Sequence, residues 1–166
     1  MDLSRRRLFF NSVRSAPFRP PWSLPESAFV GACTRCDACI KECPTGLLQR
    51  GDGGFPVAEF AASACSFCGE CAKACTAKAI SREQIPVPWS FSIKIADDCL
   101  AYQRVECRVC GELCETGAIR FRPTRGGISR PDVDSSACSG CGACFSPCPV
   151  GAITRVSRPS LSMELS

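Results

Sequence analysis

The chain has 166 residues, and 16 of them are cysteine, a share at which a short sequence needs cross-links or metal to explain its composition. Hydrophobic residues make up 45% of the chain, but more than a fifth of these are cysteines, so an ordinary aliphatic core is excluded. There is no histidine, which excludes His-ligated zinc, haem and Rieske centres and acid–base catalysis by histidine. A disulfide framework and metal ligation both remain, and the spacing must decide between them.

Residues 1–26 are predicted to form an extended, basic, proline-rich arm, because they carry the cluster FRPPWSLP. The stretch SRRRLFF resembles a twin-arginine export motif, but arginines interrupt the apolar run that a signal peptide requires. We therefore expect a cytoplasmic protein. No apolar run reaches 18 residues, which predicts no membrane span, and the scattered basic residues predict no nucleic-acid partner. The arginines of the arm are Arg5, Arg6, Arg7, Arg14 and Arg19.

The cysteines form four groups of four, with none left over. Three groups have the spacing C-x2-C-x2-C-x3-C, which is the [4Fe-4S] ligand pattern of bacterial ferredoxins. Three thiolates on one tight loop bind three corners of the iron cube. The predicted metal ligands are Cys33, Cys36, Cys39 and Cys43; Cys65, Cys68, Cys71 and Cys75; Cys99, Cys107, Cys110 and Cys114; and Cys138, Cys141, Cys144 and Cys148.

The third group departs from the pattern, because seven residues separate Cys99 from Cys107 where the other groups have two. An aliphatic pair nevertheless follows the fourth cysteine at the same offset in all groups, in CPTGLL, CTAKAI, CETGAI and CPVGAI. A five-residue insertion therefore displaces only the first ligand. We predict four [4Fe-4S] clusters, or three if the Cys99/Cys107/Cys110/Cys114 group is empty. A cluster there without Cys99 would have three thiolates and be transferable.

In paired motifs of this kind the fourth cysteine ligates the cluster of the other motif. The expected crossed sets are Cys33, Cys36, Cys39 with Cys75; Cys65, Cys68, Cys71 with Cys43; Cys138, Cys141, Cys144 with Cys114; and Cys99, Cys107, Cys110 with Cys148. Ligation within each group is the alternative.

Two other cross-linking chemistries fit the spacing less well. Disulfides would not repeat it three times, and a four-cysteine zinc site needs two separated C-x2-C pairs, so zinc stays an alternative mainly at the third group. Four oxidised clusters, each about −2 with its thiolates, would turn the formal net charge of +4 into about −4.

The largest step between groups falls between the second and the third, which divides the chain into two units. The predicted fold is α+β, with tandem two-cluster ferredoxin-like units at 27–80 and 91–157, a linker at 81–90 and a tail at 158–166. Each unit is expected to contain a hairpin, around Gly51–Gly54 and around Gly126–Gly127. A strand with Phe91, Ile93 and Ile95 on one face is expected to open the second unit.

Several segments together resemble the NapF family of ferredoxin-type proteins, over residues 19–153: RPPWS, CTRCDACI followed by LQRGDGGFP, CSFC, and CLAYQRVECRVCGELCE followed by FRP. The resemblance implies a cytoplasmic iron–sulfur accessory protein that binds NapA, the catalytic subunit of periplasmic nitrate reductase, and assists its maturation before export. Family members are commonly described with three clusters, whereas the repeat predicts four. A general electron carrier between redox partners is the alternative function. We expect no enzyme, because no nucleophile or acid–base constellation occurs.

Overall fold

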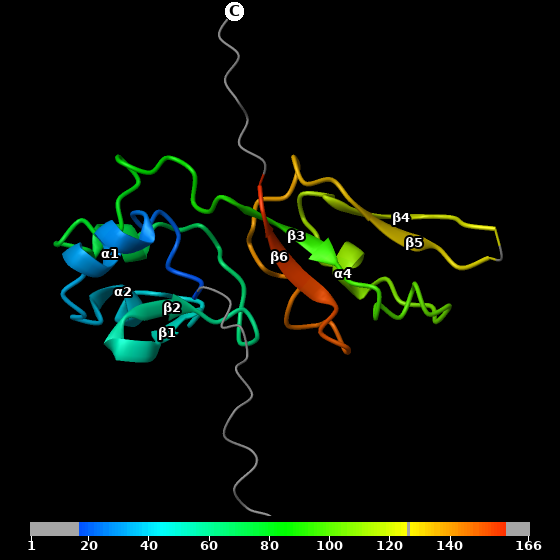
Figure 1. The fold of residues 1–166 in the computed structure, drawn as a ribbon, viewed down its shortest axis with the longest axis horizontal. Coiled ribbons are helices and arrows are strands. Elements are labelled where there is room, and N and C mark those ends of the chain that lie inside the picture. Colours follow the sequence, from blue (N-terminus) through cyan, green and yellow to red (C-terminus); the bar gives the residue numbers. More distant parts are fainter. Residues whose placement is uncertain (1–16, 126, 159–166) are drawn as a thin grey trace, which may run out of the picture.

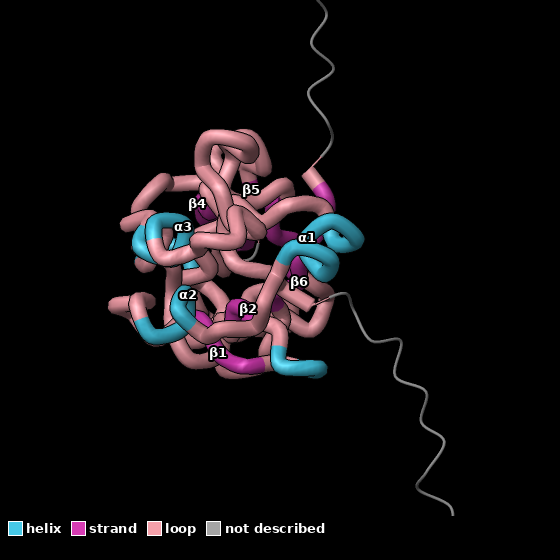
Figure 2. Tube along the Cα trace, turned by 90° about the vertical axis from the view of Figure 1, so that its left-hand side faces the viewer, coloured by secondary structure: helices cyan, strands magenta, loops and turns pink. Residues whose placement is uncertain are grey.

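The computed structural model describes residues 17–125 and 127–158, in which short helices and two-stranded sheets are joined by long loops (Figures 1 and 2). The mixture of helices and strands confirms the predicted α+β class. The elements in chain order are α1 (Glu26–Ala32), α2 (Ala38–Lys41), β1 (Leu48–Arg50), η1 (Asp52–Gly54), β2 (Pro56–Ala58), α3 (Glu70–Lys73), β3 (Phe91–Ile95), α4 (Val109–Glu112), β4 (Ile119–Arg122), β5 (Arg130–Val133) and β6 (Ile153–Ser157).

Some of the predicted features fall outside the described residues. These are most of the basic arm, with Arg5, Arg6, Arg7 and Arg14, then Gly126 of the predicted second turn, and residues 159–166 of the predicted tail. Over the part that the structure describes, no helix is both long and apolar enough to cross a membrane.

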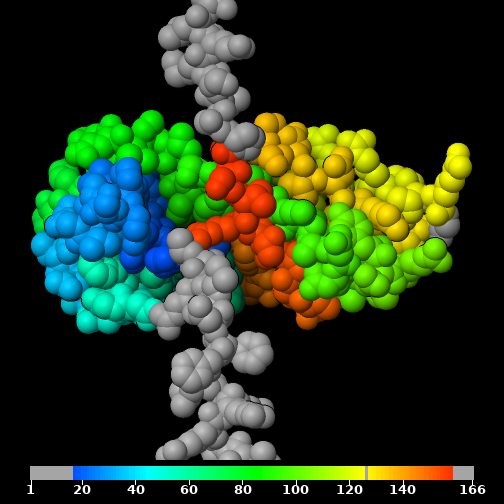
Figure 3. Space-filling model, in the orientation of Figure 1, coloured from blue at the N-terminus to red at the C-terminus, as the bar shows by residue number. Residues whose placement is uncertain are grey.

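Figure 1 shows two lobes side by side. One holds α1, α2, α3 and the β1–β2 hairpin, and the other holds β3, β6, α4 and the β4–β5 hairpin, which extends away from the first lobe. Strand β6 lies where the lobes meet, and Figure 3 shows it at the surface there, in red. The unit boundaries given above, at 27–80, 81–90 and 91–157, stay predictions.

Both expected hairpins are present. β1 pairs antiparallel with β2, with Leu48 opposite Ala58, around the turn that was predicted at Gly51–Gly54. β4 pairs antiparallel with β5, with Ile119 opposite Val133. The predicted strand at 91–95 is β3, and its antiparallel partner is β6 at the far end of the second lobe's sequence.

The aliphatic pair that follows each group of cysteines is buried in all four copies. Because burial of apolar side chains is favourable, these pairs fix the chain just after the fourth cysteine of each group. The repeat in the sequence is therefore also a repeat in packing. The pairs are Leu47 and Leu48 (1% and 3% exposed), Ala79 and Ile80 (both 1%), Ala118 and Ile119 (1% and 5%), and Ala152 and Ile153 (1% and 7%).

The described part of the arm packs against the first lobe. Trp22 is 3% exposed, and its backbone N–H donates to the carbonyl oxygen of Pro88 at an N···O distance of 2.8 Å. The next bond joins the N–H of Leu24 to the carbonyl oxygen of Ala79, at 3.0 Å. The arm and the 81–90 segment are therefore attached to each other as well as to the lobe.

Candidate metal centres

Tight turns surround the second cysteine of each regular group. The residues just before and just after it adopt the left-handed conformation, which in the first group are Arg35 (φ 57°) and Asp37 (φ 61°). Such a conformation costs a residue other than glycine of the order of 1–3 kcal/mol, so the surrounding loop must impose it. Successive turns of this type direct backbone N–H groups into one concavity, where they can stabilise negatively charged sulfur. The same pairs in the second and fourth groups are Phe67 and Gly69, and Gly140 and Gly142.

The third group lacks this paired turn. Arg108, just after the second cysteine, has φ −131°, and Arg104 in the insertion has φ 64°. Cys99 is nevertheless held firmly, because it is 8% exposed and Ala101 beside it is 1% exposed. The Tyr102 hydroxyl also donates to the carbonyl oxygen of Pro131, at 3.3 Å. The inserted loop is therefore packed into the second lobe and keeps the displaced cysteine inside it.

Three cavities each bring together three cysteines of one group and the fourth cysteine of the neighbouring group. This is the crossed combination, in which the fourth cysteine comes from the neighbouring group. The sets are Cys33, Cys36, Cys39 with Cys75; Cys65, Cys68, Cys71 with Cys43; and Cys99, Cys107, Cys110 with Cys148.

The remaining four cysteines belong to the second lobe. Cys114, Cys138 and Cys144 pack in the same apolar cluster. Burial raises the pKa of Cys144 to about 12, and the neighbouring charges of Cys141 and Cys138 add to the rise. Three crossed sets therefore line one cavity each, and most of the fourth set packs in one apolar cluster together with cysteines of the third.

Burial is the main cause of the high thiol pKa values in the centres. The pKa of Cys39 rises to about 11, and after burial the largest contribution comes from the charge of Cys75. Four thiols in one partly dry site cannot all ionise without a positive charge, so these sites favour a bound cation over free thiolates. Burial likewise raises the pKa of Cys65 and Cys110 to about 11, and of Cys71 to about 12.

Two thiols differ, because hydrogen bonds to sulfur lower their pKa. The backbone N–H of Ala38 and then the Thr34 hydroxyl lower the pKa of Cys36. At Cys43 burial acts in the opposite direction, but bonds from the chain, the backbone N–H of Leu48 foremost, outweigh it. These donors would stabilise a thiolate ligand in the same way.

Two threonine hydroxyls contact fourth cysteines. The distance from Cys43 Sγ to Thr45 Oγ1 is 3.6 Å, and Cys114 Sγ lies at the same distance from Thr116 Oγ1. These threonines were not among the predicted site residues, although threonine stands two residues after the fourth cysteine in both groups. A hydroxyl that donates to a ligating sulfur favours the more negative, reduced state of a cluster.

The donor set and its arrangement fit iron–sulfur clusters. In the described residues no three His, Cys, Asp or Glu side chains are close enough to hold a single metal ion. The thiols stand around cavities instead, whereas zinc would need four sulfurs within about 2.3 Å of one point. Each set offers four sulfurs to a multi-iron centre, which suits a [4Fe-4S] cube.

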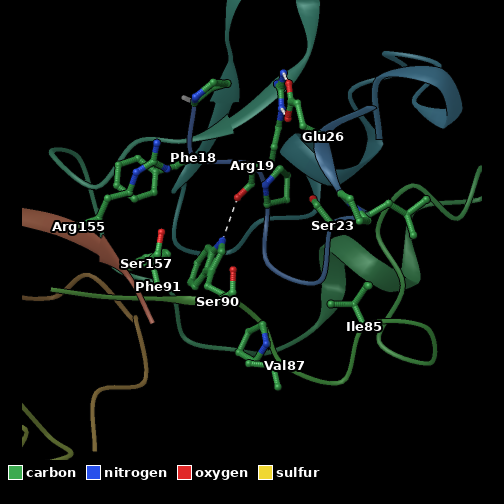
Figure 4. Close-up of a pocket in the computed structure, with 16 residues that line it drawn as sticks. Phe18, Arg19, Ser23, Glu26, Ile85, Val87, Ser90, Phe91, Arg155 and Ser157 are labelled. Atoms are coloured by element: carbon green, nitrogen blue, oxygen red, sulfur yellow. Dashed lines mark hydrogen bonds and ion pairs between the residues drawn. The ribbon is translucent and has the colours of Figure 1, made fainter. Parts of the chain in front are cut away.

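A larger cavity of about 660 Å³ lies beside the junction of the lobes and is lined by no cysteine (Figure 4). The arm closes one side of it, where the Trp89 indole N–H donates to the carbonyl oxygen of Arg19 at 3.0 Å. The Arg19 guanidinium in turn is paired with the Glu26 carboxylate, at 2.6 Å. These polar groups already bond one another at the edge of the cavity. They hold the arm against the first lobe.

Comparisons with known proteins agree with this geometry. A family model described as a 4Fe-4S dicluster domain matches residues 32–101, and a second with the same description matches residues 103–152. Two dicluster domains in tandem account for [4Fe-4S] clusters, up to four, in this chain. They also agree with the predicted tandem arrangement of ferredoxin-type units.

Relatives that match along most of the chain are also ferredoxin-type proteins. "Ferredoxin-type protein NapF" of Escherichia coli (strain K12) is 49% identical over 156 residues, which cover 93% of this chain and 94% of the relative. The NapF of Haemophilus influenzae is 47% identical, over 82% of this chain and 77% of the relative. "Methylamine utilization ferredoxin-type protein MauM" of Methylorubrum extorquens is 31% identical, over 85% and 72%.

Proposed function

Because the chain belongs to the NapF family of ferredoxin-type iron–sulfur proteins, we propose that it acts in the cytoplasm, where it binds NapA, the catalytic subunit of periplasmic nitrate reductase. There it assists the maturation of NapA before export, by delivering electrons or an iron–sulfur cluster. The observation that carries this proposal is the likeness to NapF along 93% of the chain, which includes the irregular third group.

The sixteen cysteines are proposed to ligate four clusters in the crossed sets. Support comes from three cavities, each lined by one such set, and from the apolar cluster that contains most of the fourth. Bound clusters supply one-electron transfer. The chain's own residues hold them, keep water away and donate hydrogen bonds to sulfur. Among the described residues we find no arrangement suited to covalent or acid–base catalysis, and we infer a carrier rather than an enzyme.

A surface for NapA is proposed beside the third group. Val109 and Val150 are exposed (38% and 40%) and line the cavity that contains Cys107 and Cys110. Leu113, 46% exposed, lies at the end of the same short helix. Exposed aliphatic side chains next to a redox centre let a partner approach closely and exclude water from the contact.

The test is a deletion strain that makes NapA, complemented with variants of this chain. Without the chain, we expect NapA to contain less iron and to have less nitrate reductase activity. Leu113→Asp, at the end of α4 and outside the lining of the cavity that contains Cys107 and Cys110, should reproduce part of that loss and leave the iron content of the chain itself unchanged. The matched control is Val30→Asp, which places a charge on the similarly exposed α1 of the first lobe.

Normal iron and activity of NapA in the deletion strain would rule out the maturation role. Reduction by the purified chain of several unrelated redox proteins at similar rates would then favour the alternative, a general electron carrier. Cell fractionation tests the compartment, because the proposal requires the chain in the cytoplasmic fraction together with NapA that has not been exported.

A further inference from the structure

The two lobes are joined by a backbone hydrogen bond between two cysteines of different groups. The N–H of Cys65 donates to the carbonyl oxygen of Cys141, at 2.8 Å. Cys65 belongs to the second group and Cys141 to the fourth, so the bond connects the proposed ligand loops of two different units. The charge of Cys141 is also among those that add to the raised pKa of Cys65, after burial and the nearer contributions.

Aromatic side chains close the same junction. The rings of Phe60 and Phe145 are stacked, with centroids 5.4 Å apart and planes inclined by 22°. Phe60 is 3% exposed and belongs to the core of the first lobe, and Phe145 directly follows the ligand position Cys144. Phe145 packs against the cores of both lobes. The Phe60 ring of the first lobe therefore lies directly against the loop that contains the fourth group.

Gly142, the residue after Cys141, is where the two loops approach most closely. A Cβ on this glycine would lie 2.0 Å from Cδ1 of the Phe60 ring, closer than any real contact. The left-handed turn itself (φ +80°) does not require glycine, because Asp37 occupies the same place in the first group at φ 61°. In the second group the corresponding Gly69 faces only the flexible end of Arg82. The ring of Phe60 is thus the reason that position 142 has no side chain.

We propose that electrons cross between the two units at this contact, which we call the crossing. The backbone hydrogen bond from Cys65 to Cys141 and the packing of Phe60 on Gly142 would hold the centre ligated by Cys65 next to the centre ligated by Cys141. The inference rests on the cluster ligation proposed above. In the crossing step one electron leaves the Cys65 side, which is oxidised, and enters the Cys141 side, which is reduced. No bond breaks and no proton moves. A one-electron reductant supplies the first electron.

The crossing joins the two pairs of centres into a single electron-transfer path. The sets around Cys65 and Cys141 are the inner ones, and those around Cys33 and Cys107 are the outer ones. Within each lobe the outer and the inner set are linked, because each contains the fourth cysteine of the other's group. An electron that enters at an outer centre of either lobe can therefore reach the outer centre of the other.

The test isolates the inner pair in the full-length chain. Cys36→Ala and Cys107→Ala together remove one ligand from each outer set, and the anaerobically loaded double variant is reduced with dithionite. We expect its electron paramagnetic resonance spectrum to be split and broadened by coupling between two neighbouring reduced centres. Adding Gly142→Ala should abolish the splitting at unchanged iron content, and adding Gly69→Ala, the matched control, should preserve it.

Uncoupled signals from the double variant with the junction intact, or splitting that survives Gly142→Ala, would overturn the proposal. If the double variant does not retain two clusters, the comparison uses the four-cluster chain with and without Phe60→Leu, and an identical spectrum counts against the crossing. The spectrum does not depend on NapA. Failure of the crossing in a fully loaded chain is therefore distinct from failure of the maturation role, which the deletion strain tests.

Discussion

The two lobes bear the same cysteine motifs but pack them differently. Around the first two groups the buried core is built from large aromatic side chains, among them Trp22, Phe29 and Phe60. Around the last two groups it consists of isoleucine, alanine and the cysteines themselves, and Phe121 and Tyr102 are only partly buried. Because aromatic side chains bury more surface than any others, the first lobe has more support of its own. We therefore expect the second lobe to depend more on bound clusters for its stability.

The lobes also differ in what they expose. Of the six large hydrophobic residues that are exposed in the described chain, four lie in the second lobe. All four, Val105, Val109, Leu113 and Val150, are in or beside the third and fourth groups. The lobe with the weaker core therefore has the more apolar surface, which suits a region that contacts a partner.

Removal of iron should reveal the largest difference between the two lobes. In the anaerobic protein treated with an iron chelator, we expect loss of the folded structure, because the centres replace an ordinary core. The second lobe should open first. Limited proteolysis followed by mass spectrometry measures this, with early cuts expected between residues 97 and 135 and later cuts in the first lobe. Simultaneous cleavage of both lobes would show that their cores are equivalent.

The displaced first ligand provides the next largest effect. Cys99→Ser should lower the iron content by up to about four atoms per chain, because the loss of one thiolate weakens the binding of one [4Fe-4S] cluster. The regular counterpart Cys33→Ser should cause a similar loss from the first lobe. Iron content that stays unchanged in Cys99→Ser would identify Cys99 as a residue other than a ligand, and would leave a three-thiolate centre there.

The aromatic core of the first lobe can be tested at Phe60. Phe60→Ala removes a ring that is 3% exposed and contacts Phe18 and Phe145, so it should destabilise the loaded protein by about 3–5 kcal/mol. Anaerobic thermal unfolding measures this as a lower midpoint. Val30→Ala, on the exposed face of α1, serves as the control and should change stability by less than about 0.5 kcal/mol. Equal effects of the two variants would contradict the assigned core.

The smallest expected effect comes from the threonine hydroxyls. Thr45→Val and Thr116→Val each remove one hydrogen bond to a sulfur that is proposed to ligate a cluster, so the reduced state should be stabilised less and the midpoint potential of that centre should fall. A bond worth about 1 kcal/mol corresponds to a shift of ~40 mV. Thr124→Val, whose hydroxyl bonds the Ile128 carbonyl at 2.6 Å, is the control for a redox titration. A rise in potential would reverse the assigned direction.

The local features of the fold could be predicted from the sequence. The glycine-rich turn predicted the β1–β2 hairpin, and the alternating residues Phe91, Ile93 and Ile95 predicted β3. These features depend on short-range patterns of turn residues and polarity. The crossed sets of cysteines were expected from the spacing and line three cavities, although the ligation itself stays a proposal.

The long-range contacts could not be predicted in the same way. β3 pairs with β6, which is about sixty residues away, and nothing in the isolated segment Ile153–Ser157 specifies that partner. The packing of Phe60 on Gly142 is likewise invisible in the sequence, because glycine fits the motif there for more than one reason. The burial of Trp22 was not predicted, because the proline-rich segment was interpreted as an extended arm.

The number of clusters in the two units follows from iron and acid-labile sulfide, measured per chain on anaerobically purified protein. We expect about sixteen of each, four per [4Fe-4S] centre, with the third group loaded. About twelve of each would contradict this expectation, and would mean that the group of Cys99, Cys107, Cys110 and Cys114 does not complete a cluster.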